Sequence, residues 1–270
     1  MDVRAACLEH QRMTSPSVDR TRQAAETLVT ARLSGHKIDR IPADCAPRSE
    51  VEAWAIQAEV ARRLGVEIGG WKVGMSPGNA PVAAPIFAPD IHASPVRVSV
   101  GREAGVIVEA EVAFRLARDL PPRRDRSAYT AAEVLDAVGG AFAAIEIVIS
   151  RYRSLADVPK LDMLADNQAN GGFVFGQVMA GWRGLALPQL PVALEVAGKT
   201  IVERQGGNPA GDPVPPLVWL ANHLATHGDG LKAGQIVTTG SYTGMNPARP
   251  GERVVARFSG LGEAIVDFIS

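Results

Sequence analysis

The 270-residue chain carries 28 lysine and arginine residues against 29 aspartate and glutamate residues, so its formal net charge of −1 excludes the basic excess that attracts nucleic acids and anionic membranes. Its composition, 46% hydrophobic and 21% charged, supplies a full hydrophobic core and excludes disorder over most of the length. The sequence has no apolar run of the about 18–20 residues that span a membrane, no leader-like N-terminus and no CxxC motif, so we expect a cytoplasmic protein with neither a membrane nor a nucleic-acid partner.

The N-terminal quarter of the sequence predicts helices. Residues 1–18 have weak periodicity and a turn-like segment, which predicts a flexible extension outside the fold. Apolar residues then recur at helical spacing over residues 19–33. A Ser-x-x-Glu capping box at Ser49 starts a second helix, and Gly65 ends it. Together these signals predict an N-terminal helical cap over residues 19–69.

From residue 70 onward the pattern changes to short apolar runs separated by turn residues. These runs, which predict strands of a mixed or largely antiparallel sheet, lie at 71–75, 105–116, 142–149, 172–178, 192–197, 234–240, 253–258 and 263–268. Two helices interrupt them, one beginning at a second capping box at Thr130 and the other running from about Pro216 to His227. We therefore expect an α+β fold with a catalytic domain over residues 70–270.

The predicted strand at residues 106–114 has one fully apolar face and carries both Glu109 and Glu111 on the other. This pattern fits a half-buried strand with a wet face, and it also fits two ligands of a metal ion. Glu146 favours the metal site, because it is the only charge in an apolar strand at residues 141–149. A carboxylate in such a strand is costly unless it is paired or bound to a metal.

Three glutamates without a nearby histidine or cysteine pattern form a set of hard oxygen ligands. Such a set suits Mg²⁺ or Mn²⁺ and suits Zn²⁺ or copper poorly. About three octahedral positions would remain for water or for a substrate such as a 2-oxo acid, which chelates through its carboxylate and the adjacent oxygen. We expect Mg²⁺, or Mn²⁺ in its place, on Glu109, Glu111 and Glu146.

Lys72 lies between apolar residues and glycines in a predicted strand. This context fits a structural lysine, whose stem packs along the strand while its ammonium reaches water. It fits a catalytic lysine equally well. A lysine desolvated near a metal would have a lowered pKa, and it would move protons or hold an enolate.

One polar loop follows a predicted strand, and a second polar loop precedes one. Residues 238–244 offer hydroxyls and backbone N–H groups in a turn that either cradles a carboxylate or simply connects a hairpin. Residues 166–172 form a similar polar loop before the strand at 172–178. The substrate-binding residues that we predict from these loops are Asn167, Asn170, Ser241 and Thr243.

Five short motifs in order resemble the 2-keto-4-pentenoate hydratase and 4-oxalocrotonate decarboxylase family, a branch of the fumarylacetoacetate hydrolase superfamily. The segments that carry the resemblance are Gly70–Gly74, Glu109–Phe114, Ile145–Arg151, Ala165–Gly176 and Thr238–Gly244. The resemblance extends from about residue 20 to the C-terminus. Each motif is short, and the family is indicated by their common order.

This resemblance implies a helical N-terminal part packed on a rolled mixed β-sheet of the fumarylacetoacetate hydrolase C-terminal-domain type. It also implies a divalent metal on the three glutamates with Lys72 beside it. The family acts on 2-hydroxydienoates and related 2-oxo acids from aromatic degradation, and its members are usually oligomeric. We therefore expect a homo-oligomer that takes a small 2-oxo or 2-hydroxydienoic acid.

The chain departs from the family pattern at two places. Val82 stands where the family commonly has an aspartate linked to acid–base work. Ala169 follows the Ala-Asp-Asn motif where the family often has a serine that contacts substrate. The metal ligands are therefore better specified by the sequence than the substrate is.

The leading hypothesis is a metal-dependent hydratase that adds water to a 2-hydroxy-2,4-dienoate and gives a 4-hydroxy-2-oxo acid, with Lys72 assisting ketonisation. A 2-oxo acid decarboxylase of the 4-oxalocrotonate type is the close alternative. A third hypothesis is a non-catalytic partner subunit of such an enzyme. The missing aspartate favours this third hypothesis, and the three glutamates with Lys72 weigh against it.

Overall fold

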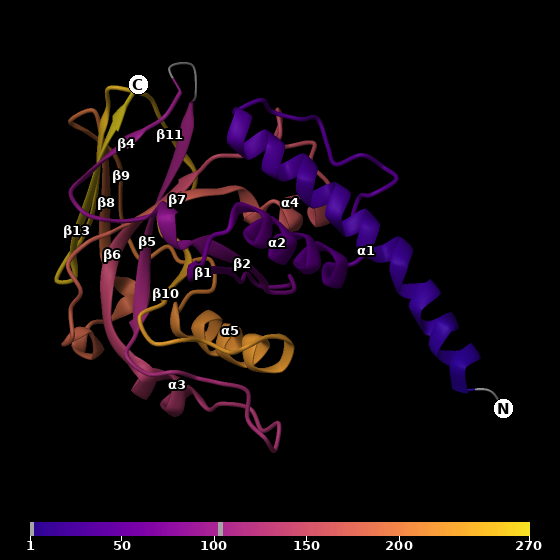
Figure 1. Ribbon diagram of the computed structural model, residues 1–270. Coiled ribbons are helices and arrows are strands. Elements are labelled where there is room, and N and C mark those ends of the chain that lie inside the picture. Colours follow the sequence, from indigo (N-terminus) through magenta and orange to yellow (C-terminus); the bar gives the residue numbers. More distant parts are fainter. Residues whose placement is uncertain (1–2, 102–104) are drawn as a thin grey trace. The chain divides into compact units, whose positions relative to one another are not determined.

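The computed structural model describes residues 3–101 and 105–270, which form two compact units. Residues 1–2 of the predicted extension over residues 1–18 lie outside the described residues. The helical unit comprises the chain up to Glu67 together with Ser150–Ala169, and the sheet unit comprises Ile68–Ile149 and Asn170–Ser270 (Figure 1). The chain thus leaves the sheet unit once, in the middle of the sequence, and then returns to it.

The helical unit is built from α1 (Val3–Ser34), α2 (Glu50–Leu64), α4 (Lys160–Ala165) and the 3-10 turn η2 (Asn167–Ala169). Helix α1 begins well before the predicted start at residue 19. The predicted start and end of α2 are confirmed: the Ser49 hydroxyl accepts a hydrogen bond from the Glu52 N–H, and Gly65 has the left-handed φ of 65° that ends many helices. Helix α2 contacts both α1 and α4.

A buried ion pair links the two ends of the segment Ser150–Ala169 within the helical unit. The Arg151 Nε lies 2.5 Å from Asp166 Oδ1, and the exposed fractions of the two side chains are 4% and 3%. Arg151 also donates through its backbone N–H to Asp166 Oδ2 and through Nη2 to the Asp166 carbonyl. Burial raises the pKa of Asp166, and Arg151 opposes this rise. No sequence pattern had assigned this segment to the helices.

The sheet unit contains two mixed sheets. The strands of the larger sheet are β1 (Ile68–Gly74), β2 (Val82–Phe87), β3 (Ile91–Ala93), β5 (Val106–Leu116), β6 (Val138–Val148), β7 (Asn170–Phe175), β10 (Ile236–Ser241) and β11 (Asn246–Ala248). Their order is β2-β1-β10-β5-β6-β7-β3, and β11 also pairs with β5. The pairs β1–β10 and β3–β7 are parallel, and the other pairs of this sheet are antiparallel.

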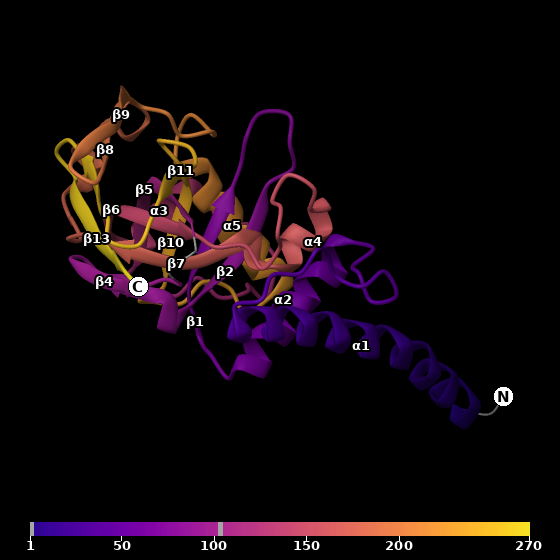
Figure 2. The same ribbon diagram turned by 90° about the horizontal axis from the view of Figure 1, so that it is seen from above.

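The smaller sheet has the order β4-β13-β12-β8-β9 (Figure 2). Its strands are β4 (Val96–Ser99), β8 (Pro191–Val196), β9 (Lys199–Gln205), β12 (Arg253–Phe258) and β13 (Gly262–Ile269). The remaining elements of the sheet unit are α3 (Ala131–Ala137), α5 (Val214–His227) and the 3-10 turns η1 (Ala88–Asp90), η3 (Trp182–Gly184) and η4 (Leu187–Gln189). The predicted capping box at Thr130 is present at the start of α3.

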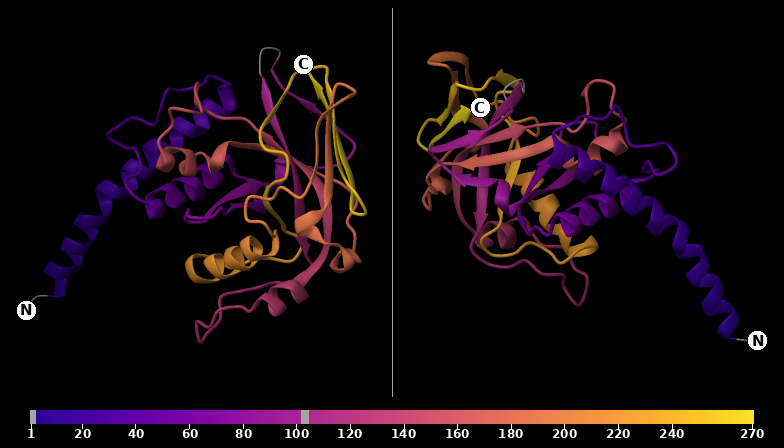
Figure 3. Two further views of the ribbon diagram at one scale, coloured as in Figure 1. Left: turned by 180° about the vertical axis from the view of Figure 1, so that it is seen from behind. Right: turned by 45° about the horizontal axis from the view of Figure 1, so that its top comes forward.

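One hydrophobic core joins the two sheets, and a second covers part of the opposite face of the larger sheet. Alternate residues of β5, from Val106 to Leu116, are buried in the first core with residues of β8, β12 and β13. Helices α3 and α5 add Val134 and Leu217 to this core, and they lie next to each other at one end of the strands (Figure 3). The second core consists of Ile86, Ala113, Phe142, Ala144, Phe173 and Ile236.

The predicted α+β fold class is confirmed, whereas several short elements were not predicted. Strand β2, which was not predicted, contains Pro85, and it lies at the edge of its sheet, where a missing N–H is tolerated. Strand β9 is largely exposed and therefore lacks an apolar run. Among the described residues, no helix is both long and apolar enough to cross a membrane.

We expect Arg151→Met to destabilise the helical unit by about 3–5 kcal/mol, because it leaves the Asp166 carboxylate buried without a counter-charge. Arg153→Met is the matched control, since Arg153 pairs with Asp39 at the surface, with side-chain exposed fractions of 65% and 77%. It should change the free energy of unfolding by less than about 1 kcal/mol. Chemical denaturation of both variants checks this prediction, which equal effects of the two substitutions would contradict.

Candidate metal centre

The strand register of the larger sheet brings the three predicted glutamates together. Glu109 of β5 lies directly opposite Glu146 of β6, and Glu111 follows two residues along on the same face. Each glutamate offers one carboxylate oxygen, and these oxygens lie within 4.8 Å of one another. The face that carries the three glutamates, here called the carboxylate face, is the face opposite the core that joins the two sheets.

Burial disfavours the ionised form of the carboxylates in this cluster. The exposed fractions of Glu111 and Glu146 are 2% and 1%, and Glu109 is half-buried. Desolvation, together with the charge of Glu146, raises the pKa of Glu111 well above its usual range and raises the pKa of Glu109. The carboxylates therefore need positive charge nearby if all three are to be ionised.

The residues fit a hard divalent cation. All three ligands are carboxylates, so the donor set is oxygen only, which Mg²⁺, Mn²⁺ and Ca²⁺ prefer over softer ligands. The convergence of three oxygens from two strands matches what one ion requires, and a cation placed among them would relieve the like-charge repulsion that raises the pKa of Glu111. The geometry thus supports the metal interpretation of the Glu-x-Glu pattern over that of a merely wet strand face.

Lys72 reaches the cluster from β1. Its Nζ lies 2.5 Å from Glu146 Oε1. Strand β1 runs close beside β10 at Gly70. A Cβ at this position would lie 2.7 Å from the Ile236 carbonyl oxygen, so only glycine permits this approach. Gly70 is therefore part of what places Lys72.

The lowered Lys72 pKa expected beside a bound metal stays a prediction for the metal-loaded site, because in the metal-free cluster the carboxylates dominate. Burial does lower the pKa of Lys72, but the adjacent Glu146, with Glu111 and Glu109, more than offsets this effect, and the net direction is upward. Sequence reasoning identified the desolvation but could not weigh it against three carboxylates. Lys72 therefore pairs with the cluster through Glu146.

Two polar side chains orient the buried glutamates. The Asn170 amide donates to Glu146 Oε1 at 3.0 Å, and the Thr238 hydroxyl donates to Glu111 Oε2. Asn170 was among the predicted site residues, but as a substrate contact. Thr238 was not selected individually, although alternation along β10 places it on the carboxylate face, directly opposite Lys72 of β1.

The remaining predicted residues have different surroundings. A hydrogen bond from Ser241 opposes the rise in the Glu109 pKa, so Ser241 also lies at the cluster. The Thr243 hydroxyl accepts a hydrogen bond from the Ala110 N–H at 3.0 Å. Asn167 belongs to the helical unit, where it has a left-handed φ of 51°, and it remains a predicted substrate-binding residue.

Val82, which replaces the family aspartate, lies at the start of β2 and is half-buried. It pairs with Gly74, and Ala84, two residues further on, pairs with Lys72. Because side chains alternate along a strand, Val82 shares the carboxylate face with Lys72. A polar residue at this position would therefore not enter the core between the sheets.

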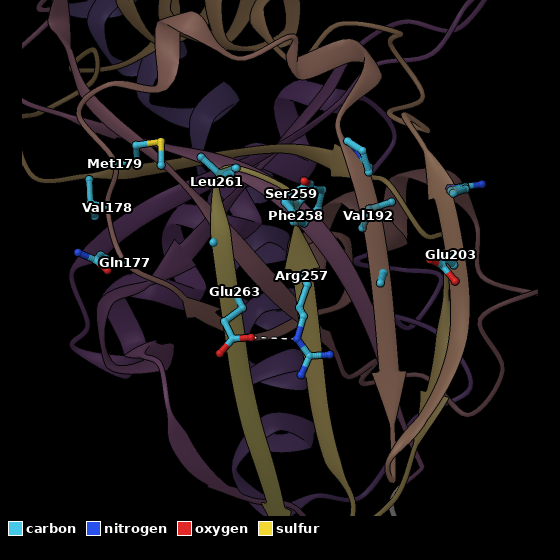
Figure 4. Close-up of a pocket in the computed structure, with 15 residues that line it drawn as sticks. Gln177, Val178, Met179, Val192, Glu203, Arg257, Phe258, Ser259, Leu261 and Glu263 are labelled. Carbon is cyan, nitrogen blue, oxygen red and sulfur yellow. Dashed lines mark hydrogen bonds and ion pairs between the residues drawn. The ribbon is translucent and has the colours of Figure 1, made fainter.

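A separate pocket of about 880 Å³ lies on the smaller sheet (Figure 4). Val192, Phe258 and Leu261 are its buried lining residues, and the ion pair of Arg257 with Glu263 lies at its exposed side. Neither the three glutamates of the carboxylate face nor their hydrogen-bond partners line this pocket. Its size alone therefore does not identify it as a catalytic site, whereas the chemistry of the carboxylate cluster does.

Comparison with known proteins finds a family match and named relatives. The family described as fumarylacetoacetate (FAA) hydrolase C-terminal matches residues 73–268, which include all three glutamates. A 2-keto-4-pentenoate hydratase of Paraburkholderia xenovorans is 32% identical over 92% of this chain and 94% of its own length. A 4-oxalocrotonate decarboxylase of Pseudomonas putida is 27% identical over 91% of this chain and 95% of its own length.

A solved structure shares the fold. It is that of a 4-oxalocrotonate decarboxylase from Pseudomonas putida complexed with magnesium and adipate, with a TM-score of 0.80 at 24% identity. The match covers 93% of this chain and 98% of that one. The expectation of a fumarylacetoacetate hydrolase type of fold is therefore confirmed.

We expect Glu146→Gln to weaken Mg²⁺ or Mn²⁺ binding by more than about 100-fold, because it removes a charged ligand and not merely a supporting hydrogen bond. Glu195→Gln is the matched control, since Glu195 lies on a strand of the same unit and pairs with Arg257 at 2.8 Å. Isothermal titration of the folded variants with each metal checks the prediction. Unchanged affinity in Glu146→Gln would exclude this glutamate from the metal centre.

Proposed function

The chain belongs to the fumarylacetoacetate hydrolase family, and from this premise we propose that it is a divalent-metal-dependent hydratase. The proposed reaction adds water to a 2-hydroxy-2,4-dienoate and gives a 4-hydroxy-2-oxo acid. The observation that carries this proposal is the convergence of Glu109, Glu111 and Glu146 beside the Lys72 ammonium. The 32% identity to a protein named 2-keto-4-pentenoate hydratase supports the choice of reaction.

The glutamates would hold Mg²⁺ or Mn²⁺, and the bound ion would supply Lewis acidity toward the carboxylate and C2 oxygen of the substrate. Lys72, kept as an ammonium by the carboxylates, serves as the proton donor of the cluster. In ketonisation, Lys72 Nζ gives a proton to C5 of the dienol and recovers one from the 2-hydroxyl. Water then adds across C3 and C4, with its oxygen on C4.

Supporting residues hold these groups in place. Asn170 and Thr238 donate to Glu146 and Glu111, which leaves the other carboxylate oxygens for the ion. Asn167 and Ser241 are the chain's remaining proposed contacts to the substrate. We place the enzyme in aromatic catabolism, as a cytoplasmic homo-oligomer, by analogy with the family.

Decarboxylation of a 4-oxalocrotonate-type substrate is the second candidate function. Proteins named 4-oxalocrotonate decarboxylase are 27% identical to this chain over more than nine-tenths of its length. The same carboxylates and lysine would serve this reaction, because both reactions need charge stabilised at the C2 oxygen of a 2-oxo acid. The two candidate functions therefore differ in product and not in the metal centre.

The test follows the ultraviolet absorbance of a 2-hydroxy-2,4-dienoate and of 4-oxalocrotonate with purified protein and Mg²⁺. Loss of the dienoate chromophore without release of CO₂ supports the hydratase. Release of CO₂ from the dicarboxylate supports the decarboxylase instead. Turnover of neither substrate by protein that binds metal contradicts both activities and favours a non-catalytic partner subunit.

Lys72→Met should still bind the metal, whose charge then compensates Glu146, but it should lower kcat by about 100-fold or more, the scale of general acid–base catalysis. Metal binding should survive because Lys72 is no ligand. Initial rates and metal titration of the same preparation check both parts of this prediction. An unaltered kcat would remove Lys72 from the mechanism.

Val82→Asp should raise the turnover of a simple 2-hydroxydienoate, because it restores the family carboxylate on the face that carries Lys72. Val82 is half-buried at a strand start, so the new charge retains access to water and the protein should stay folded. Turnover and melting temperature are the two measurements. A folded variant that is no faster would indicate that this chain serves a different 2-oxo acid reaction.

A further inference from the structure

The larger sheet is irregular beside the two glutamates of β5. In the pairing of β10 with β5, Thr238 lies opposite Ala113 and Ser241 lies opposite Glu111, so β10 has one residue more than β5 over this stretch. Such an extra residue is a β-bulge, which breaks the ladder of backbone hydrogen bonds. The chain then makes a turn before β11 pairs with β5 again, with Asn246 opposite Val108.

This interruption leaves the backbone of Ala110, between Glu109 and Glu111, without a regular strand partner on one side. The Ala110 carbonyl accepts a hydrogen bond from the Tyr242 N–H at 2.8 Å. Its N–H donates to a side chain, the Thr243 hydroxyl, at 3.0 Å. Thr243 therefore supplies the acceptor that a backbone carbonyl would supply in an unbroken sheet.

The Thr243 hydroxyl is fully engaged in this turn. It accepts from Ala110 and donates to the Gly244 carbonyl at 3.4 Å, and the residue is buried. Other polar groups complete the bulge in the same way: the Asn208 amide donates to the carbonyls of Thr239 and Gly240. Specific hydrogen bonds therefore hold the chain in place around the break, and the strand does not simply fray there.

We propose that Thr243 is a positioning residue of the metal centre, which holds Glu109 and Glu111 at the spacing needed for one cation by binding the Ala110 N–H between them. This inference rests on the proposed function only in taking the carboxylate cluster as a metal site. It replaces the expectation that Thr243 contacts substrate. Without the hydroxyl, a buried N–H loses its acceptor, and the β5 backbone must shift to find water.

The experiment compares Thr243→Val, which keeps the shape but loses the hydroxyl, with Thr243→Ser, which keeps it. Metal affinity is titrated with Mn²⁺ and Mg²⁺ in the absence of substrate, and exchange of the Ala110 amide is followed by NMR in metal-free protein. We expect Thr243→Val to bind metal about 10–100-fold more weakly, the range for residues that orient ligands. Its Ala110 amide should exchange about tenfold faster. Thr243→Ser should restore both values.

The matched control is Thr226→Val on α5, where the hydroxyl donates to the Asn222 carbonyl at an exposed position. It should leave metal affinity and Ala110 exchange unchanged, and an effect equal to that of Thr243→Val would overturn the proposal. If Thr243→Val does not fold, Thr243→Ala removes the hydroxyl without adding a methyl group and makes the same comparison with Thr243→Ser.

The outcomes separate this inference from the proposed function. Normal metal affinity and normal Ala110 exchange in Thr243→Val, with a raised KM, would make Thr243 a substrate contact and overturn the inference alone. Wild-type protein that binds no divalent metal would overturn the proposed function and this inference together. Weaker metal binding in Thr243→Val, restored by serine, supports the inference whichever substrate proves correct.

Discussion

The repulsion among three clustered carboxylates, two of them buried, is the constraint on which the sheet unit depends. Glu109, Glu111 and Glu146 carry three negative charges when ionised, and the Lys72 ammonium compensates for one of them. The remaining two charges equal those that one divalent cation brings. Without that cation the cluster responds by raising the pKa of Glu111 and Glu109, which is how buried acids avoid an uncompensated charge.

The sheet provides the rigid frame that this repulsion requires. Strand β5 is anchored on one side by its continuous pairing with β6, from Ile107 to Arg115. One of its faces is buried in the core between the sheets, and the other is held by the second core around Phe142 and Phe173. With packing on both faces, the buried carboxylates of Glu111 and Glu146 cannot turn toward solvent without disrupting this packing. The irregularity at β10 is therefore confined to one edge of β5.

The sequence predicted the parts of the site that depend on strand periodicity. The alternation around Glu109 and Glu111 and the isolated charge of Glu146 were sufficient to select three residues that the register brings together. Quantities that depend on the balance of neighbours were not predictable in this way. The direction of the Lys72 pKa needed the distances to the carboxylates, and the acceptor role of Thr243 needed the bulge in β10. Similarly, Arg151 and Asp166 lie fifteen residues apart, so their buried pairing could not be derived from local patterns.

The proposed metal centre and the two departures from the family pattern lie in different parts of the chain. Relatives named for hydration and for decarboxylation align over more than nine-tenths of this chain, so overall similarity does not distinguish between the two reactions. Both departures from the family pattern, Val82 and Ala169, fall outside the three proposed metal ligands and outside their direct hydrogen-bond partners. Val82 nevertheless shares the face of Lys72, where a side chain can alter proton transfer without altering metal affinity. Substitutions at such neighbouring positions can change the reaction, while the three carboxylates and the repulsion among them stay the same.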